Sequence, residues 1–258
     1  MTTLFSASFF MFGAILASFV GVVAGRLYTG QSFLRGVSRC DACGKPLSAW
    51  SLIPIFSYTA SSGRAHCCRA RISPLAPLGE LTLGALFTLG YLQLGLSLEL
   101  GAFLLALTLL AALVLYDLAH QILPPPLLAL FVATAAFAGY VAQSDWPSFL
   151  ATLGIAALFA LFFALLHFLS GGRAMGLADT PLVFGLALLV GPAALPGFLF
   201  SFWIGAGVGI VLLAASPHGS RMGIEVPFAP FLAAGFLLAY FTQWDPLALT
   251  AALMARLI

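Results

Sequence analysis

The feature that most limits the fold of this chain is a series of long apolar runs without charged residues. Runs of about 20 apolar residues match the length of an α-helix that crosses a lipid bilayer. Only 7% of the 258 residues are charged and 62% are hydrophobic, whereas a soluble domain has about 25% charged residues. The sequence therefore predicts an all-α, polytopic membrane protein. It excludes a soluble enzyme, and it excludes a protein that binds nucleic acid through a basic face.

The apolar runs predict a bundle of about eight transmembrane helices packed in membrane lipid. Their expected ranges are Leu4–Val23, Pro77–Leu94, Leu98–Tyr116, Leu123–Val141, Phe149–Leu169, Thr180–Leu195, Gly197–Ala215 and Val226–Thr242. A polar segment rich in turns separates the first run from the others. We therefore divide the chain into a first transmembrane helix (1–27), a loop domain (28–76) and a transmembrane core (77–258). The oligomeric state does not follow from this pattern.

Small residues in the seventh run predict a close helix contact. Gly205, Ala206, Gly207 and Gly209 lie in the stretch 197–209. Because glycine has no side chain, two helix backbones can approach each other closely at such positions. We expect a neighbouring helix to pack against this stretch.

Basic residues set the expected orientation in the membrane. Seven of the ten lie between Arg26 and Arg71, in the polar segment. Because Lys and Arg are enriched in cytoplasmic loops, we expect the loop domain to be cytoplasmic. Alternation then places the breaks near residues 117–122, 171–179 and 216–225 on the same side.

Two acids lie where an ionisable group is costly. Asp117 follows an apolar run and precedes a proline-rich segment, and Asp179 follows a glycine-containing segment where a span begins. An acid at membrane depth marks a functional site unless it is merely solvated or caps a helix. Two neighbouring carboxylates can share one proton, so that one activates water while the other protonates a carbonyl oxygen. This is the chemistry of an aspartic protease, and a proton-coupled transporter is the alternative.

Six segments, taken in order, resemble the type IV prepilin peptidases, which are membrane aspartic proteases that cut the leader from prepilins and pseudopilins. The segments are Ala17–Leu27, Cys40–Tyr58, Arg71–Glu80, Asp117 with Pro124, Gly176–Asp179 and Val226–Gly235. The resemblance covers nearly the whole chain. It implies that Asp117 and Asp179 form the catalytic dyad of a multi-pass protein in the bacterial inner membrane, with a prepilin or pseudopilin precursor as its partner.

Many members of that family also methylate the new N-terminus with S-adenosylmethionine. The resemblance implies a role in methylation for Glu80, and an acid favoured at a helix start is the alternative. Gly21 stands where the first span usually has Asn, a departure that bears on methylation more than on proteolysis. Ala178 stands where the Gly-x-Gly-Asp motif has its second glycine, and Pro181 stands where the family commonly has Lys. These two departures, with Ala65 in the cysteine loop, leave a catalytically silent relative as a further alternative, beside a related Gly-x-Gly-Asp protease with other substrates.

The four cysteines all lie in the polar segment. Cytoplasmic thiols stay reduced, and the C-x-x-C spacing of Cys40 and Cys43 is half of a zinc site. In the resembling family the second pair is again C-x-x-C, and Cys68 occupies its second position here. We expect a structural zinc held by these three cysteines, with Cys67 or His66 as the fourth ligand. A segment that folds without metal is the alternative.

Overall fold

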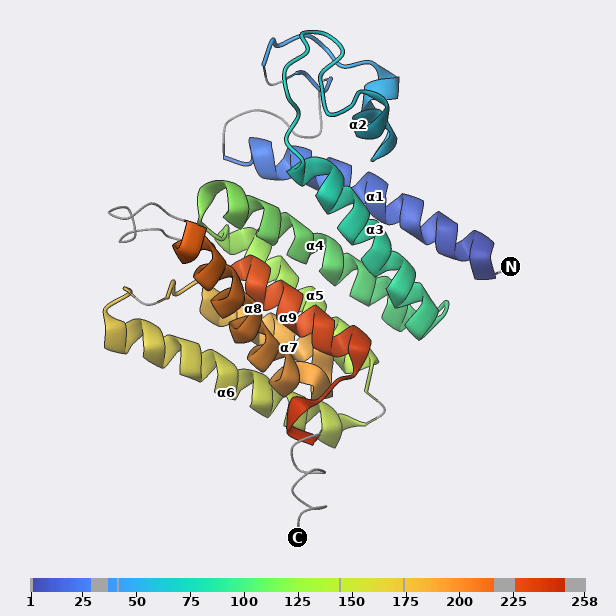
Figure 1. The fold of residues 1–258 in the computed structure, drawn as a ribbon. Coiled ribbons are helices and arrows are strands. Elements are labelled where there is room, and N and C mark those ends of the chain that lie inside the picture. Colours follow the sequence, from blue (N-terminus) through green and yellow to red (C-terminus); the bar gives the residue numbers. More distant parts are fainter. Residues whose placement is uncertain are drawn as a thin grey trace. The chain divides into compact units, whose positions relative to one another are not determined.

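The computed structural model describes residues 2–28, 37–40, 42–143, 145–173, 175–215 and 226–248. Within these ranges the fold is all-α, and the only extended pairing consists of two isolated β-bridges, Arg39–Pro46 and Arg64–Arg71. The chain forms two compact units, residues 1–115 and 116–258, shown in Figure 1. Each unit is described by itself.

In the described part of the chain, helices form in all eight predicted ranges. The long helices are α1 (Thr2–Arg26), α3 (Leu75–Leu94), α4 (Leu98–His120), α5 (Pro125–Val141), α6 (Trp146–Ser170), α7 (Asp179–Val190), α8 (Ala194–Ala215) and α9 (Ala229–Thr242). Three shorter elements are η1 (Ala49–Leu52), α2 (Phe56–Ala60) and η2 (Gly191–Ala193). The prediction of an all-α helix bundle is confirmed.

Five helical stretches of the described chain are long and apolar enough to cross a membrane. One of them is the continuous stretch Asp179–Ala215, which contains α7, η2 and α8. The helices α5 and α9 are apolar but shorter, with 17 and 14 residues. The chain is therefore a multi-pass membrane protein. That α5 and α9 each cross the membrane on their own stays a prediction.

Two of the differences between the predicted and the observed helix boundaries concern candidate site residues. The helix α4 continues to His120, so Asp117 lies inside its last turn and not in a break. The helix α3 begins at Leu75, which places Glu80 beyond the first turn. Because the helix dipole acts within the first turn, the interpretation of Glu80 as a helix-start acid is wrong. The predicted break at 216–225 and the tail beyond residue 248 lie outside the described residues.

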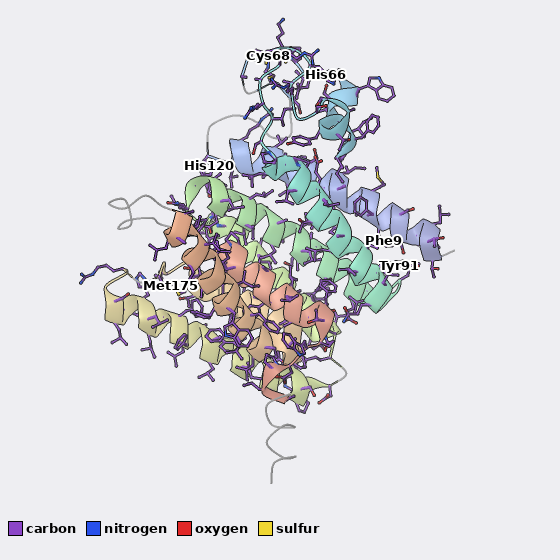
Figure 2. All side chains as sticks on the ribbon, in the orientation of Figure 1. Phe9, His66, Cys68, Tyr91, His120 and Met175 are labelled. Carbon is purple, nitrogen blue, oxygen red and sulfur yellow. The ribbon has the colours of Figure 1, made fainter. Side chains whose placement is uncertain are left out.

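In the first unit, α1 and α3 pack through small residues. A side chain at Gly13 would overlap Gly84 of α3, so the two backbones are as close as glycine allows. Towards the N-terminus of α1, Phe9 stacks on Tyr91 with ring centroids 4.8 Å apart (Figure 2). The Oγ1 of Thr88 also donates a hydrogen bond across the pair to a main-chain carbonyl of α1.

In the second unit, α7 is the central helix. It contacts α5, α6 and α9 (Figure 1), and all of its residues from Gly185 to Val190 are buried. Its close contacts to α5 use glycine, because a side chain at Gly139 would overlap the carbonyl of Leu188. A helix that is apolar on all sides is stable only when it is surrounded. The helices packed around α7 therefore fix the position of its first residue, Asp179.

The helices α8 and α9 pack closely, which confirms the predicted contact for the stretch 197–209 but not for all of its glycines. The closest approach is between Ser201 and Gly235, where an added side chain would overlap the serine. Gly205 does contact α9, but a side chain at Gly207 or Gly209 would meet nothing within 4 Å in the part of the chain that the structure describes. The prediction of a close contact is therefore wrong for the last two glycines. The contact lies nearer the start of α8, where the two helices meet.

Candidate active site

Some acids of this chain have plain structural roles. Asp145 caps α6 by accepting the main-chain N–H of Ser148 over 3.2 Å. Asp245 accepts the main-chain N–H of Leu247 over 2.8 Å. These carboxylates satisfy N–H groups that the first turn of a helix leaves unpaired. The two acids singled out in the apolar region have different surroundings.

Asp117 lies on the last turn of α4 and is only 6% exposed. Its Oδ2 accepts a hydrogen bond from the main-chain N–H of Ala229, at a distance of 3.3 Å. Ala229 is the first residue of α9, and the unpaired N–H groups of a helix start favour a negative partner. The start of α9 therefore holds the Asp117 carboxylate in place.

Asp179 is the first residue of α7 and is half-buried. Its carboxylate accepts a hydrogen bond from the main-chain N–H of Gly176. A side chain at Gly176 would lie 3.4 Å from Oδ2, so glycine gives the carboxylate room against this turn. Ala178 has φ −69° and ψ −18°, which any residue adopts. The alanine that replaces the second motif glycine is therefore accommodated without strain.

Asp117 and Asp179 both lie in the second unit. They are far apart in the sequence, yet the charge of Asp117 acts on Asp179. Where two carboxylates come within close range they cannot both ionise cheaply, and such a pair holds one proton between them. A pair of this kind can supply an acid and a base at one place.

The four cysteines of the first unit form a compact cluster. The Sγ atoms of Cys40, Cys43, Cys67 and Cys68 all lie within 4.8 Å of one another. Three of the separations are 3.7, 3.3 and 3.9 Å, and four sulfurs in a tetrahedron around one zinc ion lie about 3.8 Å apart. His66 lies outside the cluster, beside Cys68 in the polar segment (Figure 2). The cluster can hold a metal ion, with Cys67 as the fourth ligand.

Two similar turns, residues 40–45 and 65–70, carry these cysteines. In each turn the N–H of the first residue donates to the carbonyl of the sixth, and the N–H of the fifth donates to the carbonyl of the first, over 2.8 to 2.9 Å. Ala65 therefore occupies in the second turn the position that Cys40 occupies in the first. Cys67, one residue before Cys68, places its sulfur in the cluster instead.

The crowding of the thiols changes their acidity. Hydrogen bonds from the main-chain N–H groups of Cys43 and Ala42 lower the pKa of Cys40 to about 7. Side-chain hydrogen bonds with Cys43 and Cys40 raise the pKa of Cys67 to about 12. A bound cation would remove this difference, because a coordinating thiol is deprotonated outright.

Glu80 is tied to the polar segment of the first unit. It is buried, and its Oε2 accepts the main-chain N–H of Ile55 over 2.6 Å. Ile55 has φ +62° and directly precedes α2, a backbone conformation that β-branched residues rarely adopt. The carboxylate therefore stabilises an unfavourable turn. No sequence motif indicated this contact, because the partner is a main-chain group.

Comparison with known proteins identifies the family. The family model described as the bacterial peptidase A24 N-terminal domain matches residues 11–94. The prepilin leader peptidase/N-methyltransferase of Bacillus subtilis (strain 168) is 32% identical over 233 residues, which are 90% of this chain and 92% of that relative. The chain belongs to the prepilin leader peptidase/N-methyltransferase family.

Two further members of the prepilin leader peptidase/N-methyltransferase family show similar identity. The relative in Myxococcus xanthus (strain DK1622) is 35% identical over 223 residues, which are 83% of this chain and 64% of the relative. The relative in Stutzerimonas stutzeri is 34% identical over 203 residues, which are 76% of this chain and 68% of the relative. Comparison with solved structures found no match. The resemblance to prepilin peptidases inferred from the motifs is confirmed.

Proposed function

We propose that this chain is a prepilin leader peptidase. It is an aspartic endopeptidase that removes the leader of type IV prepilins or pseudopilins at the cytoplasmic face of the bacterial inner membrane, and it methylates the new N-terminus. The observation that carries the proposal is the pair Asp117 and Asp179, two interacting carboxylates that each accept a main-chain N–H. Relatives over most of the chain carry the corresponding name.

The proposed cleavage uses one protonated and one ionised carboxyl group. The ionised carboxylate takes a proton from water, whose oxygen attacks the carbonyl carbon of the scissile peptide bond. The protonated carboxyl gives its proton to the carbonyl oxygen. The carbon–nitrogen bond of the resulting gem-diol then breaks as the leaving nitrogen takes the proton from the first carboxyl, while one hydroxyl of the intermediate returns its proton to the second carboxylate. One water is consumed, and the dyad returns with one shared proton.

Main-chain groups preorganise this dyad. The N–H of Ala229 fixes the rotamer of Asp117, and the N–H of Gly176 fixes that of Asp179. Because α7 is packed on several sides by other helices, Asp179 has a rigid base. Fixed geometry of this kind lowers the barrier, since the groups need not be ordered during the reaction.

We further propose that the cysteine cluster binds a structural zinc ion. The ligands are Cys40, Cys43, Cys67 and Cys68, whose sulfur separations suit a tetrahedral site. Bound zinc would link the turns 40–45 and 65–70 and so fold the polar segment. It has no part in the peptide cleavage described above.

The proposed methylation uses S-adenosylmethionine, which supplies the methyl group when bound. Glu80 is 8% exposed and already accepts the N–H of Ile55. Its surroundings do not fit direct contact with a soluble cofactor, which needs an accessible carboxylate oxygen. In this proposal Glu80 supports methylation indirectly, because its hydrogen bond to Ile55 holds the polar segment in place.

The test is a cleavage assay of the full chain in detergent with a purified type IV prepilin. Wild type, Asp117→Asn, Asp179→Asn and the matched control Asp145→Asn are compared, and mass spectrometry detects both the cut and any added methyl group. Asparagine caps a helix as well as aspartate, so the control keeps its activity while both dyad variants lose cleavage. A wild type that leaves several prepilins intact would instead favour the silent-relative alternative.

A further inference from the structure

His167 lies near the end of α6, away from any motif that the proposed reaction uses. Its Nδ1 is 2.9 Å from the main-chain carbonyl oxygen of Met175, a residue between α6 and α7 that is labelled in Figure 2. A carbonyl oxygen only accepts hydrogen bonds, so Nδ1 carries the proton and donates it. The imidazole therefore joins the end of α6 to the segment that leads into α7.

The peptide group that accepts this hydrogen bond also contacts the proposed dyad. The carbonyl of Met175 and the N–H of Gly176 belong to one planar peptide unit, and that N–H donates to the Asp179 carboxylate. A peptide unit is rigid, so fixing the direction of its carbonyl also fixes the direction of its N–H. Hydrogen bonds in such a chain also polarise one another.

The segment before Gly176 needs this support. Gly171 and Gly172 both have positive φ, of +60° and +78°, and consecutive glycines give a chain wide conformational freedom. The main-chain bonds of these glycines return to the end of α6. The His167 ring covers Gly172, where an added side chain would lie 3.3 Å from Cε1. The ring thus holds both ends of the turn.

We propose that His167 is a positioning residue of the peptidase: through the Met175–Gly176 peptide group it aims the N–H that holds Asp179. The inference rests on the proposed function, because it assigns His167 a role in the dyad's geometry. In this role His167 acts on Asp179 through the peptide group and takes no part in the proton transfers. Its loss lowers kcat and leaves substrate binding, and therefore KM, unchanged.

The test compares three variants of the full chain in detergent with a purified type IV prepilin. Asparagine places its amide nitrogen close to the position of Nδ1, whereas glutamine places it near Nε2 and leucine has no donor. We expect His167→Leu and His167→Gln to lower kcat by about 10- to 100-fold with KM within about twofold. His167→Asn is expected to restore kcat to within about threefold of wild type.

An adjacent pair of glycine variants gives a control that leaves the histidine in place. Gly172→Ala presses on the His167 ring, whereas a side chain at Gly171 meets nothing within 4 Å. Both alanines bear the strain of a positive φ, so the inference predicts a lower kcat for Gly172→Ala than for Gly171→Ala. Thermal unfolding of each variant separates loss of folding from loss of positioning.

Two results would overturn the inference while leaving the proposed function intact. One is a His167→Leu enzyme with the kcat of wild type. The other is a His167→Asn enzyme that loses as much kcat as His167→Leu, since the ring would then act by packing alone. A wild type that does not cut prepilin, or an Asp179→Asn variant that does, overturns the proposed function and this inference with it.

Discussion

Single main-chain N–H groups hold the three buried or half-buried acids that matter most in this chain. Asp117 accepts one from the start of α9, Asp179 from its own preceding turn, and Glu80 from Ile55. A carboxylate held by a main-chain donor keeps its rotamer, because the donor cannot move without the helix or turn that carries it. The position of each carboxylate therefore depends on the helix or turn that supplies its donor.

The hydrogen bond of Glu80 gives a prediction for the polar segment. Glu80→Ala removes the acceptor of the Ile55 N–H, whereas Glu80→Gln keeps a carbonyl oxygen at the same place. A hydrogen bond to a charged group contributes about 1.5–3 kcal/mol, so the alanine variant should exchange the Ile55 amide about 10- to 100-fold faster. Hydrogen-exchange mass spectrometry of the peptide 53–60 measures this. Equal exchange in the alanine variant and wild type would contradict it.

The sequence predicted the candidate acids but not their partners. Asp117 and Asp179 were recognisable because an acid is costly in an apolar region. The donors to Glu80 and Asp117, and the acceptor of His167, are main-chain atoms. Every residue carries such atoms, so no residue type in the sequence marks them. Their positions follow only from the folded backbone.

The two cysteine turns make a prediction about metal binding. Cys67→Ala removes one ligand and should weaken zinc binding by at least about tenfold. Ala65→Cys combined with Cys67→Ala places the sulfur at the position equivalent to Cys40, and should restore the affinity. Competition with a chelator measures both. Binding that is unchanged in Cys67→Ala would show that this thiol is not a ligand.

The contact between α8 and α9 makes a prediction about stability. Gly235→Ala would overlap Ser201, whereas Gly207→Ala meets open space. Overpacking of this kind costs about 1–3 kcal/mol, so the first variant should unfold at a lower temperature in detergent. The second should match wild type or exceed it slightly, because alanine restricts the unfolded chain. Equal unfolding temperatures for the two variants would contradict the observed packing.

Helix positions followed from the sequence more closely than helix contacts did. Apolar runs mark helices because the bilayer demands a minimum length and internal hydrogen bonding. Packing depends on which small residue faces which neighbouring helix, and the run 197–209 contains several small residues. Only the structure shows that Ser201 meets Gly235 while Gly207 faces open space. The end of α4 was predicted before Asp117 because the apolar run stops there, whereas the helix continues to His120.

The whole molecule has a predicted orientation in the membrane, set by its basic residues. Trp50 lies in the polar segment and Trp146 at the start of α6, and both are well exposed, at 74% and 58%. The positive-inside rule places the first in the cytoplasm and the second outside. A thiol reagent that cannot cross membranes should therefore label Trp146→Cys in spheroplasts, and Trp50→Cys only after permeabilisation. The opposite labelling pattern would reverse the orientation.

The central claim is that Asp117 and Asp179 act as one catalytic unit. The most direct test measures kcat/KM for prepilin cleavage by wild type, Asp117→Asn, Asp179→Asn and the double variant. Residues that act together are strongly non-additive, so each single variant should lose about 10³-fold or more and the double variant no more than either. Losses that multiply in the double variant, or a single variant that cleaves at nearly the wild-type rate, would contradict the dyad.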